Sequence, residues 1–385
     1  MEKLLQNDPS TMLWRSADTV VEKVCKIKKG ERVVIITNRK LDAGVPNTQV
    51  ISTALYDACV DAGAETVMII QKEKSLLDTA DDVVMAALKT HPQVVFSVSA
   101  DKMGKDKEGA LKPYVGDNGV KYDGLFDYLL HGKKEIRAVW MPGINLDMFV
   151  RTVNIDYAEL SRTAKKIEKL YQGVQSVQVT TALGTDILVP VEGRTAMIDD
   201  GNFSTPGSGG NIPAGEIFIS PLVGTGVGTG CQGKIIFDCS MSVTGGDFII
   251  DSPIHVAVKD GFVTDVSGGH EAERLLESIK NAEKAAHLRE KNGTLKSGLG
   301  EVYAKNARNI GEFGIGLNPA AAITGNMLED EKSFKTCHFA IGANYDEDAP
   351  SLIHLDGVVE NPTITFNYAG GKKLAVEIDG VLQLA

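Results

Sequence analysis

The pattern of apolar residues changes after residues 157–173, and this change constrains the fold more than any other feature of the sequence. Before it, apolar runs of strand length alternate with segments of helical spacing, such as 32–37 followed by 48–64. Strands that alternate with helices indicate βαβ units and a parallel sheet. After it, 176–194 alternates apolar and polar residues with a period of two, which is typical of half-exposed antiparallel strands.

The sequence therefore predicts an α/β protein of two domains, as its length of 385 residues also favours. An N-terminal Rossmann-like parallel-sheet domain is expected over 1–165, and a C-terminal α+β domain rich in antiparallel strands over 166–385. Further strands are predicted at 65–70, 93–99 and 137–143, further helices at 78–91, 157–173 and 270–293, and a hairpin turn at 259–261.

The charge balance excludes several classes of partner. The chain has 40 basic and 51 acidic residues and a net charge of −11, which argues against nucleic-acid and anionic-membrane partners. No apolar stretch reaches the length of a membrane span, and the N-terminus lacks the pattern of a signal peptide, so a cytoplasmic location is expected. The five cysteines form no C-x-x-C pair, which favours reduced, buried thiols over a thiolate zinc site.

Two common catalytic motifs can be rejected. The glycine string GTGVGTG at 224–230 lacks the third glycine of G-x-G-x-x-G and no helix follows it, so it predicts a loop and no nicotinamide cofactor. The chain contains no G-x-S-x-G. Cys337 and His338 are neighbours on a predicted strand, where successive side chains point to opposite faces, so packing is the expected role of Cys337.

His354 and Asp356 lie two residues apart within an apolar run, and this spacing indicates a shared site. On a strand, residues i and i+2 face the same side, so both side chains can bind one metal ion. An imidazole with a carboxylate suits zinc, cobalt, manganese or iron. For these two residues alone, a buried, hydrogen-bonded His–Asp pair without a metal is the favoured explanation.

Other ionisable residues in apolar or glycine-rich surroundings favour the metal. Glu216 in GNIPAGEIFISP precedes an apolar strand, and Glu312 in NIGEFGIGLNP is flanked by glycine and apolar residues. His338 and Tyr345 lie in a similar setting in HFAIGANY. Buried carboxylates are rare unless they are paired or bind a metal. Several such residues in one half of the chain are explained together by a single metal site.

These blocks resemble those of the M29 metallo-aminopeptidases, the family of aminopeptidase T and aminopeptidase S. GNIPAGEIFISP is similar to that family's N-x-P-x-G-E-x-x-x-x-P block, and IGEFGIGLNP, HFAIGANY and IHLDG are similar to later blocks in the same order. The segment ALYDACVDAGAETVMII also resembles the α/β domain of the family. The resemblance covers most of the chain.

The resemblance implies a dinuclear metal site in the C-terminal domain. The positions that match the family's ligands are Glu216, Glu312, His338, Tyr345, His354 and Asp356. It implies two divalent ions (zinc, cobalt or manganese), Glu312 as a bridging and catalytic carboxylate, and Tyr345 as a ligand or as a catalytic donor to the oxyanion. Asp346, Glu347 and Asp348 are candidates to bind a substrate amine, although such a run is more often a solvated loop.

The activity implied is removal of N-terminal residues from short peptides by a homodimeric aminopeptidase. The 2,5-dihydroxypyridine dioxygenases also resemble this chain, notably at DGFVTDVSGGHEAERL, and hold one iron with two histidines and one aspartate. One iron-binding histidine of the dioxygenases falls at the position of Glu312, and the dioxygenases have no glutamate at the position of Glu216. His354 and Asp356 fit both families. A third alternative is a sugar- or peptide-binding protein with a structural ion, which the missing signal peptide disfavours in its periplasmic form.

Overall fold

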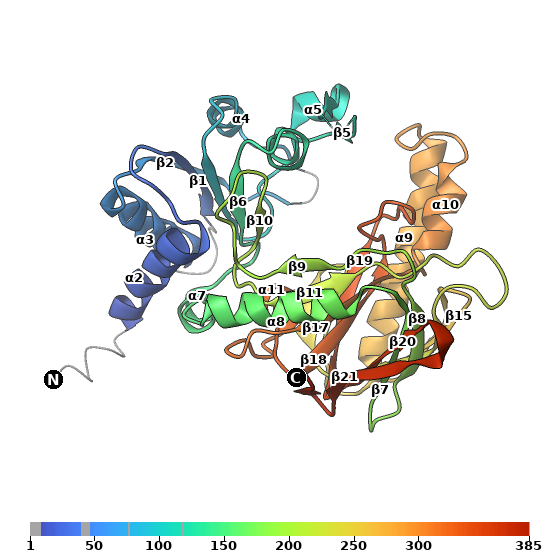
Figure 1. The fold of residues 1–385 in the computed structure, drawn as a ribbon. Helices are drawn as coiled ribbons and strands as arrows, with labels where there is room; N and C mark the ends of the chain where they lie inside the picture. The colour runs from blue at the N-terminus through green and yellow to red at the C-terminus, as the bar shows by residue number, and fades with distance from the viewer. Residues whose placement is uncertain (1–8, 40–46, 76–77, 118, 385) are drawn as a thin grey trace. The chain divides into compact units, whose positions relative to one another are not determined.

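The computed structural model describes residues 9–39, 47–75, 78–117 and 119–384 of the chain (Figure 1). The chain separates into two compact units: Met1–Ser161 with Asp199–Ala214, and Arg162–Ile198 with Gly215–Ala385. The helix α8 (Tyr157–Leu170) runs across the first boundary. One unit contains a parallel sheet and the other contains large antiparallel sheets, so the predicted α/β class is confirmed.

The first unit is built from short strands that alternate with helices. Its elements are α2 (Pro9–Thr19), the π-helical turn η1 (Val20–Val24), β1 (Arg32–Arg39), α3 (Asn47–Asp61), β2 (Glu65–Lys72), α4 (Asp82–Leu88), β3 (Val94–Val98), α5 (Lys107–Leu111), β4 (Tyr114–Val115), β5 (Lys121–Tyr122), α6 (Leu125–Asp127), the π-helical turn η2 (Tyr128–Gly132), β6 (Arg137–Trp140), α7 (Leu146–Thr152) and β10 (Gly209–Asn211). The strand order in its five-stranded sheet is β10-β6-β3-β1-β2, and every pair is parallel.

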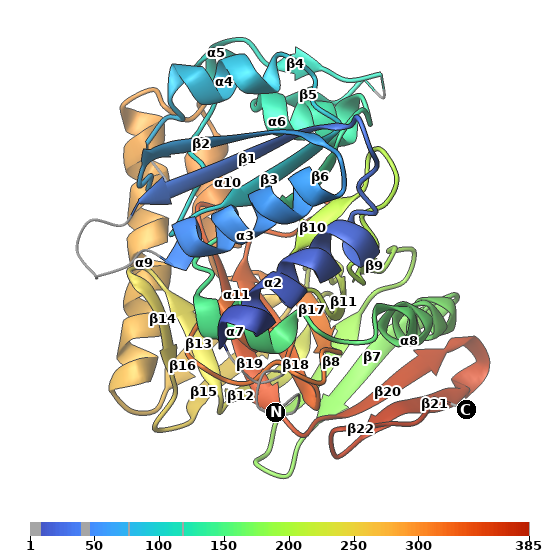
Figure 2. The same cartoon turned by 90° about the vertical axis from the view of Figure 1, so that its left-hand side faces the viewer.

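Both faces of this parallel sheet are covered by helices (Figure 2). On one face, a buried apolar cluster joins α4, α6 and η2 to β1, β3 and β6. On the other face, α3 packs on β1 and α2 packs on α3. All five residues of β3 are buried, as expected for a parallel strand that is covered on both sides.

The second unit consists mostly of antiparallel strands. Its elements after α8 are β7 (Val174–Thr180), β8 (Asp186–Pro190), β9 (Met197–Asp199), β11 (Glu216–Ile219), β12 (Gln232–Phe237), β13 (Ser240–Val243), β14 (Gly246–Ile249), β15 (Ile254–Lys259), β16 (Phe262–Ser267), α9 (His270–Lys291), α10 (Leu299–Asn306), β17 (Ile310–Gly316), α11 (Met327–Asp330), β18 (Thr336–Gly342), β19 (His354–Glu360), β20 (Thr363–Tyr368), the 3-10 turn η3 (Ala369–Gly371), β21 (Lys373–Ile378) and β22 (Val381–Leu382). They form a seven-stranded sheet, β14-β13-β19-β18-β17-β11-β9, and an eight-stranded sheet, β16-β15-β12-β8-β7-β20-β21-β22.

The local expectations from the sequence hold at the hairpin and at the cysteines. Asp260 and Gly261 connect β15 to β16 with φ values of 55° and 86°, the positive values that a tight hairpin turn of this kind requires. The five cysteines are all buried and free. Over the part of the chain that the structure describes, no helix is both long and apolar enough to cross a membrane.

A buried carboxyl group on β21 makes the stability of the fold sensitive to pH. Glu377 is 1% exposed, its Oε2 atom has no hydrogen-bond partner, and burial raises its pKa from 4.5 to about 8. Between these values the folded protein holds a proton that the unfolded chain has released. The free energy of unfolding therefore falls as the pH rises through this window.

We expect Glu377→Gln to remove this part of the pH dependence, because a neutral amide carries no buried charge. The free energy of unfolding rises by about 1–3 kcal/mol at pH 8 and changes much less at pH 5. Denaturant titrations at the two pH values measure this difference. The matched control is Glu277→Gln on the exposed side of α9. If the free energy of unfolding of Glu377→Gln rises equally at pH 5 and pH 8, the prediction is contradicted.

Candidate metal centre

Four neighbouring strands of the seven-stranded sheet bring most of the predicted ligands together. Glu216 begins β11, Glu312 lies on β17, His338 lies on β18, and His354 and Asp356 lie on β19. These strands are adjacent in the order β19-β18-β17-β11. Residues that are far apart in the sequence therefore meet because antiparallel pairing aligns their strands.

The strand register puts the ligands on one face and small residues between them. Ala340 is opposite both Glu312 and Asp356, and Gly314 is opposite His338. Directly opposite residues point to the same face of a sheet. A methyl group and a hydrogen atom at these positions leave space between the longer polar side chains. The intervening residues, such as Phe313 and Phe339, point to the other face, where their rings contact each other at 5.3 Å.

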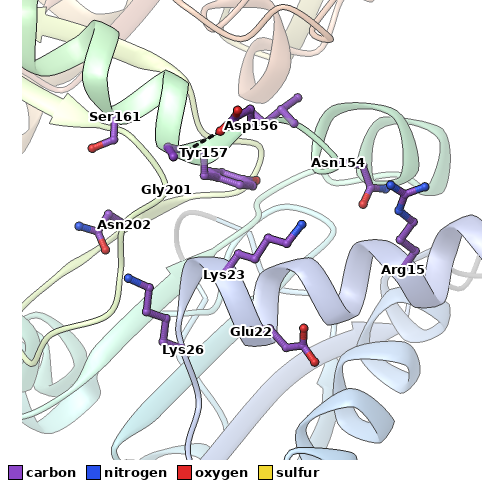
Figure 3. A pocket seen from close by; sticks show the side chains of 12 residues that line it. Arg15, Glu22, Lys23, Lys26, Asn154, Asp156, Tyr157, Ser161, Gly201 and Asn202 are labelled. Carbon is purple, nitrogen blue, oxygen red and sulfur yellow. Dashed lines mark hydrogen bonds between the residues drawn. The ribbon is translucent and has the colours of Figure 1, made fainter.

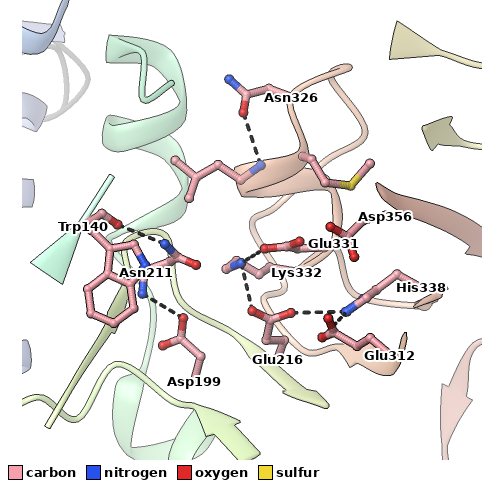
Figure 4. A network of polar contacts seen from close by, with 12 residues as sticks. Trp140, Asp199, Asn211, Glu216, Glu312, Asn326, Glu331, Lys332, His338 and Asp356 are labelled. Atoms are coloured by element: carbon pink, nitrogen blue, oxygen red, sulfur yellow. Dashed lines mark hydrogen bonds and ion pairs between the residues drawn. The ribbon is translucent and has the colours of Figure 1, made fainter. Parts of the chain in front are cut away.

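The polar atoms form two clusters that share Glu312. Figure 4 shows the first of them, in which Glu216, Glu312 and His338 point toward one another. In the first, His338 Nε2 lies 3.4 Å from Glu312 Oε1 and 3.5 Å from Glu216 Oε2. In the second, His354 Nε2 lies 3.0 Å from Glu312 Oε2 and 3.4 Å from Asp356 Oδ1. In each cluster the potential ligand atoms all lie within 4.8 Å of one another, so each could hold one metal ion. Five of the six predicted ligands are thus brought together.

The ionisable groups of the clusters perturb one another strongly. Burial opposes ionisation of Glu312, but hydrogen bonds with His338 and His354 outweigh it and lower the pKa of Glu312 to about 2. Burial alone would lower the pKa of His338, whereas its hydrogen bond with Glu312 and the nearby carboxylates raise it to about 9. The pKa of His354 is raised in the same way by Asp356 and Glu312. The imidazolium protons therefore supply positive charge that metal ions would supply when bound.

Two further charged residues lie in this centre that the sequence did not single out. Lys332 is fully buried, and its Nζ atom lies 3.0 Å from Glu216 Oε1 and also contacts the Glu331 carboxylate (Figure 4). Burial raises the pKa of Glu216 to about 8, an effect that the Lys332 charge partly offsets. The only available signal in the sequence was the charged run LEDEK at 328–332, which also fits a solvated turn.

The donor set fits divalent metal ions. Glu216, Glu312, His338 and Asp356 are at most 9% exposed. Asp356 Oδ1 and His338 Nδ1 are buried without a hydrogen-bond partner among the described residues. Buried carboxylates with free lone pairs beside imidazoles are typical ligands of zinc, manganese, cobalt or iron.

The predicted Tyr345 lies on the loop between β18 and β19. Its ring lies 5.4 Å from the ring of His354 and 5.1 Å from that of Phe218, and its side chain is half-exposed. The charge of Glu312, followed by burial, raises the pKa of the Tyr345 hydroxyl, so this group stays protonated at neutral pH. Its role as a ligand or as an oxyanion donor stays a prediction.

Arg194 fixes the loop that carries Tyr345. The guanidinium lies 2.7 Å from Asp348 Oδ2 and 3.3 Å from Asp346 Oδ1, and it donates to the carbonyl oxygen of Pro221 at 3.3 Å. Two of the three acidic residues considered for amine binding are therefore paired with an arginine. Their immediate role is to hold the loop, since a guanidinium between two carboxylates forms strong, directional hydrogen bonds.

A cavity of about 710 Å³ in the first unit offers different chemistry (Figure 3). Arg15, Lys23 and Lys26 contribute positive charge to its lining, and Tyr157 and Asn202 also line it. None of the residues that line it is a histidine or cysteine. Among the described residues, clusters of metal ligands are thus found on the strands of the second unit, and the residues that line this cavity belong to neither of them.

Gly314→Ala tests whether the empty position beside His338 is required. A β-carbon at residue 314 would lie 2.1 Å from His338 Cε1 and Nε2, so the imidazole is displaced from Glu312 and Glu216. We expect weaker metal binding and a loss of about 1–3 kcal/mol in the free energy of unfolding. Elemental analysis and thermal unfolding measure both effects. Gly226→Ala is the control because its β-carbon meets no atom, and equal behaviour of the two variants contradicts the prediction.

Arg194→Gln tests the attachment of the Tyr345 loop. Charge-assisted hydrogen bonds contribute about 1.5–3 kcal/mol, so local opening of residues 344–348 increases about tenfold or more. Hydrogen exchange followed by mass spectrometry measures this opening. Arg151→Gln, which removes an exposed Arg–Asp pair on α7, is the matched control and leaves exchange of the loop unchanged. Unchanged exchange of 344–348 in Arg194→Gln shows that Arg194 does not fix the loop.

Comparisons with known proteins agree with this architecture. The structure of 2,5-dihydroxypyridine dioxygenase from Pseudomonas putida KT2440 is similar to the chain, with a TM-score of 0.68, 15% identity, and coverage of 98% of each chain. The structure of wild-type AmpT from Thermus thermophilus is also similar, with a TM-score of 0.61, 13% identity, and coverage of 97% of this chain and 99% of that one. At such identities these similarities show the fold alone.

The sequence comparison is more specific. No curated protein sequence matches the chain. The family model described as NicX: 2,5-dihydroxypyridine 5,6-dioxygenase matches residues 147–365, more than half of the chain and all of the strands that carry the two clusters. The similarity to aminopeptidase T is therefore supported at the level of the fold, and the chain belongs to the 2,5-dihydroxypyridine 5,6-dioxygenase family of enzymes.

Proposed function

We propose that the protein is a metal-dependent aminopeptidase that removes N-terminal residues from short peptides with two divalent ions. The observation that carries this proposal is the composition of the two clusters. Each combines one imidazole with two carboxylates, and they share Glu312 through its two oxygens. A carboxylate between two such clusters is suited to bridge a pair of ions. Neither cluster has the two histidines and one carboxylate of a mononuclear iron oxygenase.

The buried charge also favours two ions. Glu216, Glu312, Glu331 and Asp356 carry four negative charges when ionised, and Lys332 balances one of them. With neutral histidines as ligands, three negative charges are left. One divalent ion leaves a buried negative charge unbalanced, which is costly in a site of low polarity. Two ions balance all three charges and leave capacity for one anionic ligand.

The residues of the chain have distinct roles in this proposal. Two divalent ions, when bound, lower the pKa of a shared water molecule and polarise the scissile carbonyl. Glu312 would contribute one oxygen to each ion, Glu216 and His338 would hold one ion, and His354 and Asp356 would hold the other. The Tyr345 hydroxyl, which stays protonated, is the candidate donor to the oxyanion.

The substrate class follows from the accessible side of the centre. His338 is fully buried, whereas the His354 side chain is 27% exposed and Tyr345 is 53% exposed, so a substrate approaches past His354 and Tyr345. Glu347 is exposed in the same loop, two residues after Tyr345. Its neighbours Asp346 and Asp348 pair with Arg194, so Glu347 is the candidate of this acidic run to bind a substrate amine. A carboxylate in this position favours peptides with a free α-amine.

A second candidate function is ring cleavage of a dihydroxypyridine with one iron ion, and family membership favours it. In that case His354 and Asp356 bind the iron, since they fit both families. The carboxylate of Glu312 would then occupy the position of a histidine ligand, and Glu216 would have no assigned role. Because the aminopeptidase assigns a role to both glutamates, it is the first candidate function.

Metal content and two activity assays separate these functions. Protein purified without chelator is expected to contain close to two zinc, cobalt or manganese ions per chain and to release leucine from leucyl peptides, while an N-acetylated peptide is left intact. One iron per chain, with oxygen uptake in the presence of 2,5-dihydroxypyridine, establishes the dioxygenase instead. Absence of metal after reconstitution contradicts both proposals.

Glu312→Gln tests the bridge directly. An amide has one oxygen acceptor and no charge, so it cannot bridge two ions as a carboxylate does. We expect metal content to fall by at least one ion per chain and the peptidase rate to fall by about 10²-fold or more, on the scale of losses for catalytic groups. Glu347→Gln, an exposed glutamate nearby, is the control for metal content. Wild-type metal content and rate in Glu312→Gln would show that the assignment is wrong.

A further inference from the structure

Lys332 is a fixed cation inside the metal centre. Its side chain is fully buried, and its ammonium group lies between the carboxylates of Glu216 and Glu331. The backbone is held on both sides, because its N–H donates to the Glu329 carbonyl at 3.0 Å and its carbonyl accepts from the Asn318 N–H at 2.8 Å. Separating a buried ammonium from the two carboxylates that it contacts is costly, so Lys332 is treated as part of the centre.

The contact with Lys332 divides the oxygens of Glu216. Its Oε1 atom faces Lys332 at 3.0 Å, and its Oε2 atom faces His338 at 3.5 Å. One oxygen of Glu216 is therefore left for a metal ion at the cluster Glu216/Glu312/His338. In the cluster Glu312/His354/Asp356, the oxygen Asp356 Oδ1 lies 3.4 Å from His354 Nε2, and the ion pairs described for its two carboxylates are with histidines.

We propose that Lys332 makes the two metal sites unequal, so that Glu312/His354/Asp356 fills first and Glu216/Glu312/His338 binds the second ion more weakly. The inference rests on the proposed two-ion function. A positive charge paired with one ligand of a site repels a divalent ion at the other oxygen of that ligand, and little water is present to screen it. The two ions also repel each other, so the contribution of Lys332 has to be measured by removing its charge alone.

Lys332→Met separates these effects, because methionine keeps an unbranched side chain of similar length and removes the charge. Metal-free protein is titrated with Co²⁺ and followed by calorimetry and by the visible absorption of the bound ion. The wild type is expected to bind in two phases, the first saturating at one ion per chain. In Lys332→Met the second phase becomes at least tenfold tighter, since Glu216 and Glu331 are left without their cation.

Four further variants identify the two sites and test whether the charge of Lys332 is the cause of their difference. Lys332→Arg keeps the charge and retains the wild-type difference between the phases, and Lys284→Met on the exposed side of α9 is the control for loss of a lysine. His338→Gln removes the second phase and His354→Gln removes the first. Two equal phases in the wild type, an unchanged second phase in Lys332→Met, or loss of the first phase in His338→Gln overturns the inference.

The stability of Lys332→Met provides a second measurement. Removal of one partner from a buried charge network destabilises the metal-free protein, so the rise in melting temperature on adding Co²⁺ is larger for Lys332→Met than for the wild type. An equal rise in both proteins counts against the inference. If the variant folds only with Co²⁺, the ratio of the affinities of its two sites is obtained instead from stepwise removal of the ion by a chelator.

These readouts are independent of peptidase activity. Suppose that the wild type binds Co²⁺ in two phases, that Lys332→Met tightens the second phase, and that the wild type does not hydrolyse peptides. This result refutes the aminopeptidase and supports the inference that the two sites are unequal. A wild type that takes up one ion refutes the two-ion enzyme, and the appearance of a second phase in Lys332→Met then supports the inference, whereas its absence overturns it.

Discussion

The structure of the second unit depends on the burial of Glu312 between two histidines. A carboxylate that is 3% exposed is stable only where charge or hydrogen bonds compensate it, and His338 and His354 lie at 3.4 Å and 3.0 Å from its two oxygens. This requirement fixes the register of three strands, because a slip of one residue would move a ligand to the apolar face. It also explains the small residues Gly314 and Ala340, since larger side chains would fill the space between the ligands.

The same sheet explains why the predicted histidine and carboxylate lie in an apolar run. His354 and Asp356 face the polar side of β19, and Leu355 and Gly357 face the other. A side chain at Gly357 would collide with Phe237 and Met241, so packing on the apolar face requires glycine at this position. Glycine is required at 314 because the imidazole of His338 occupies the space beside it on the polar face. One face of the sheet therefore provides the rigid support, and the other presents the chemistry at fixed spacing.

Much of this architecture follows from the sequence, but some parts could not be read from it. The alternation of strands and helices predicts the parallel sheet, and the spacing of His354 and Asp356 predicts their common face. The return of Asp199–Ala214 to the first unit leaves no mark in the periodicity, because β10 is only three residues long. Lys332 was missed for a different reason. A charged residue at the end of a short helix is normally solvated, and only the packing of distant strands shows that this one is buried.

Membership of a dioxygenase family is compatible with the proposed hydrolysis, because fold and site are separable. The strand β19 supplies an imidazole and a carboxylate that either chemistry can use, whereas Glu216, Glu312 and Lys332 are the residues to which the proposed function assigns control of the number of cations. Two glutamates add negative charge to the sheet, and Lys332 removes part of it. In this proposal the number of ions depends on the charge balance among these three side chains, on a scaffold that both activities share.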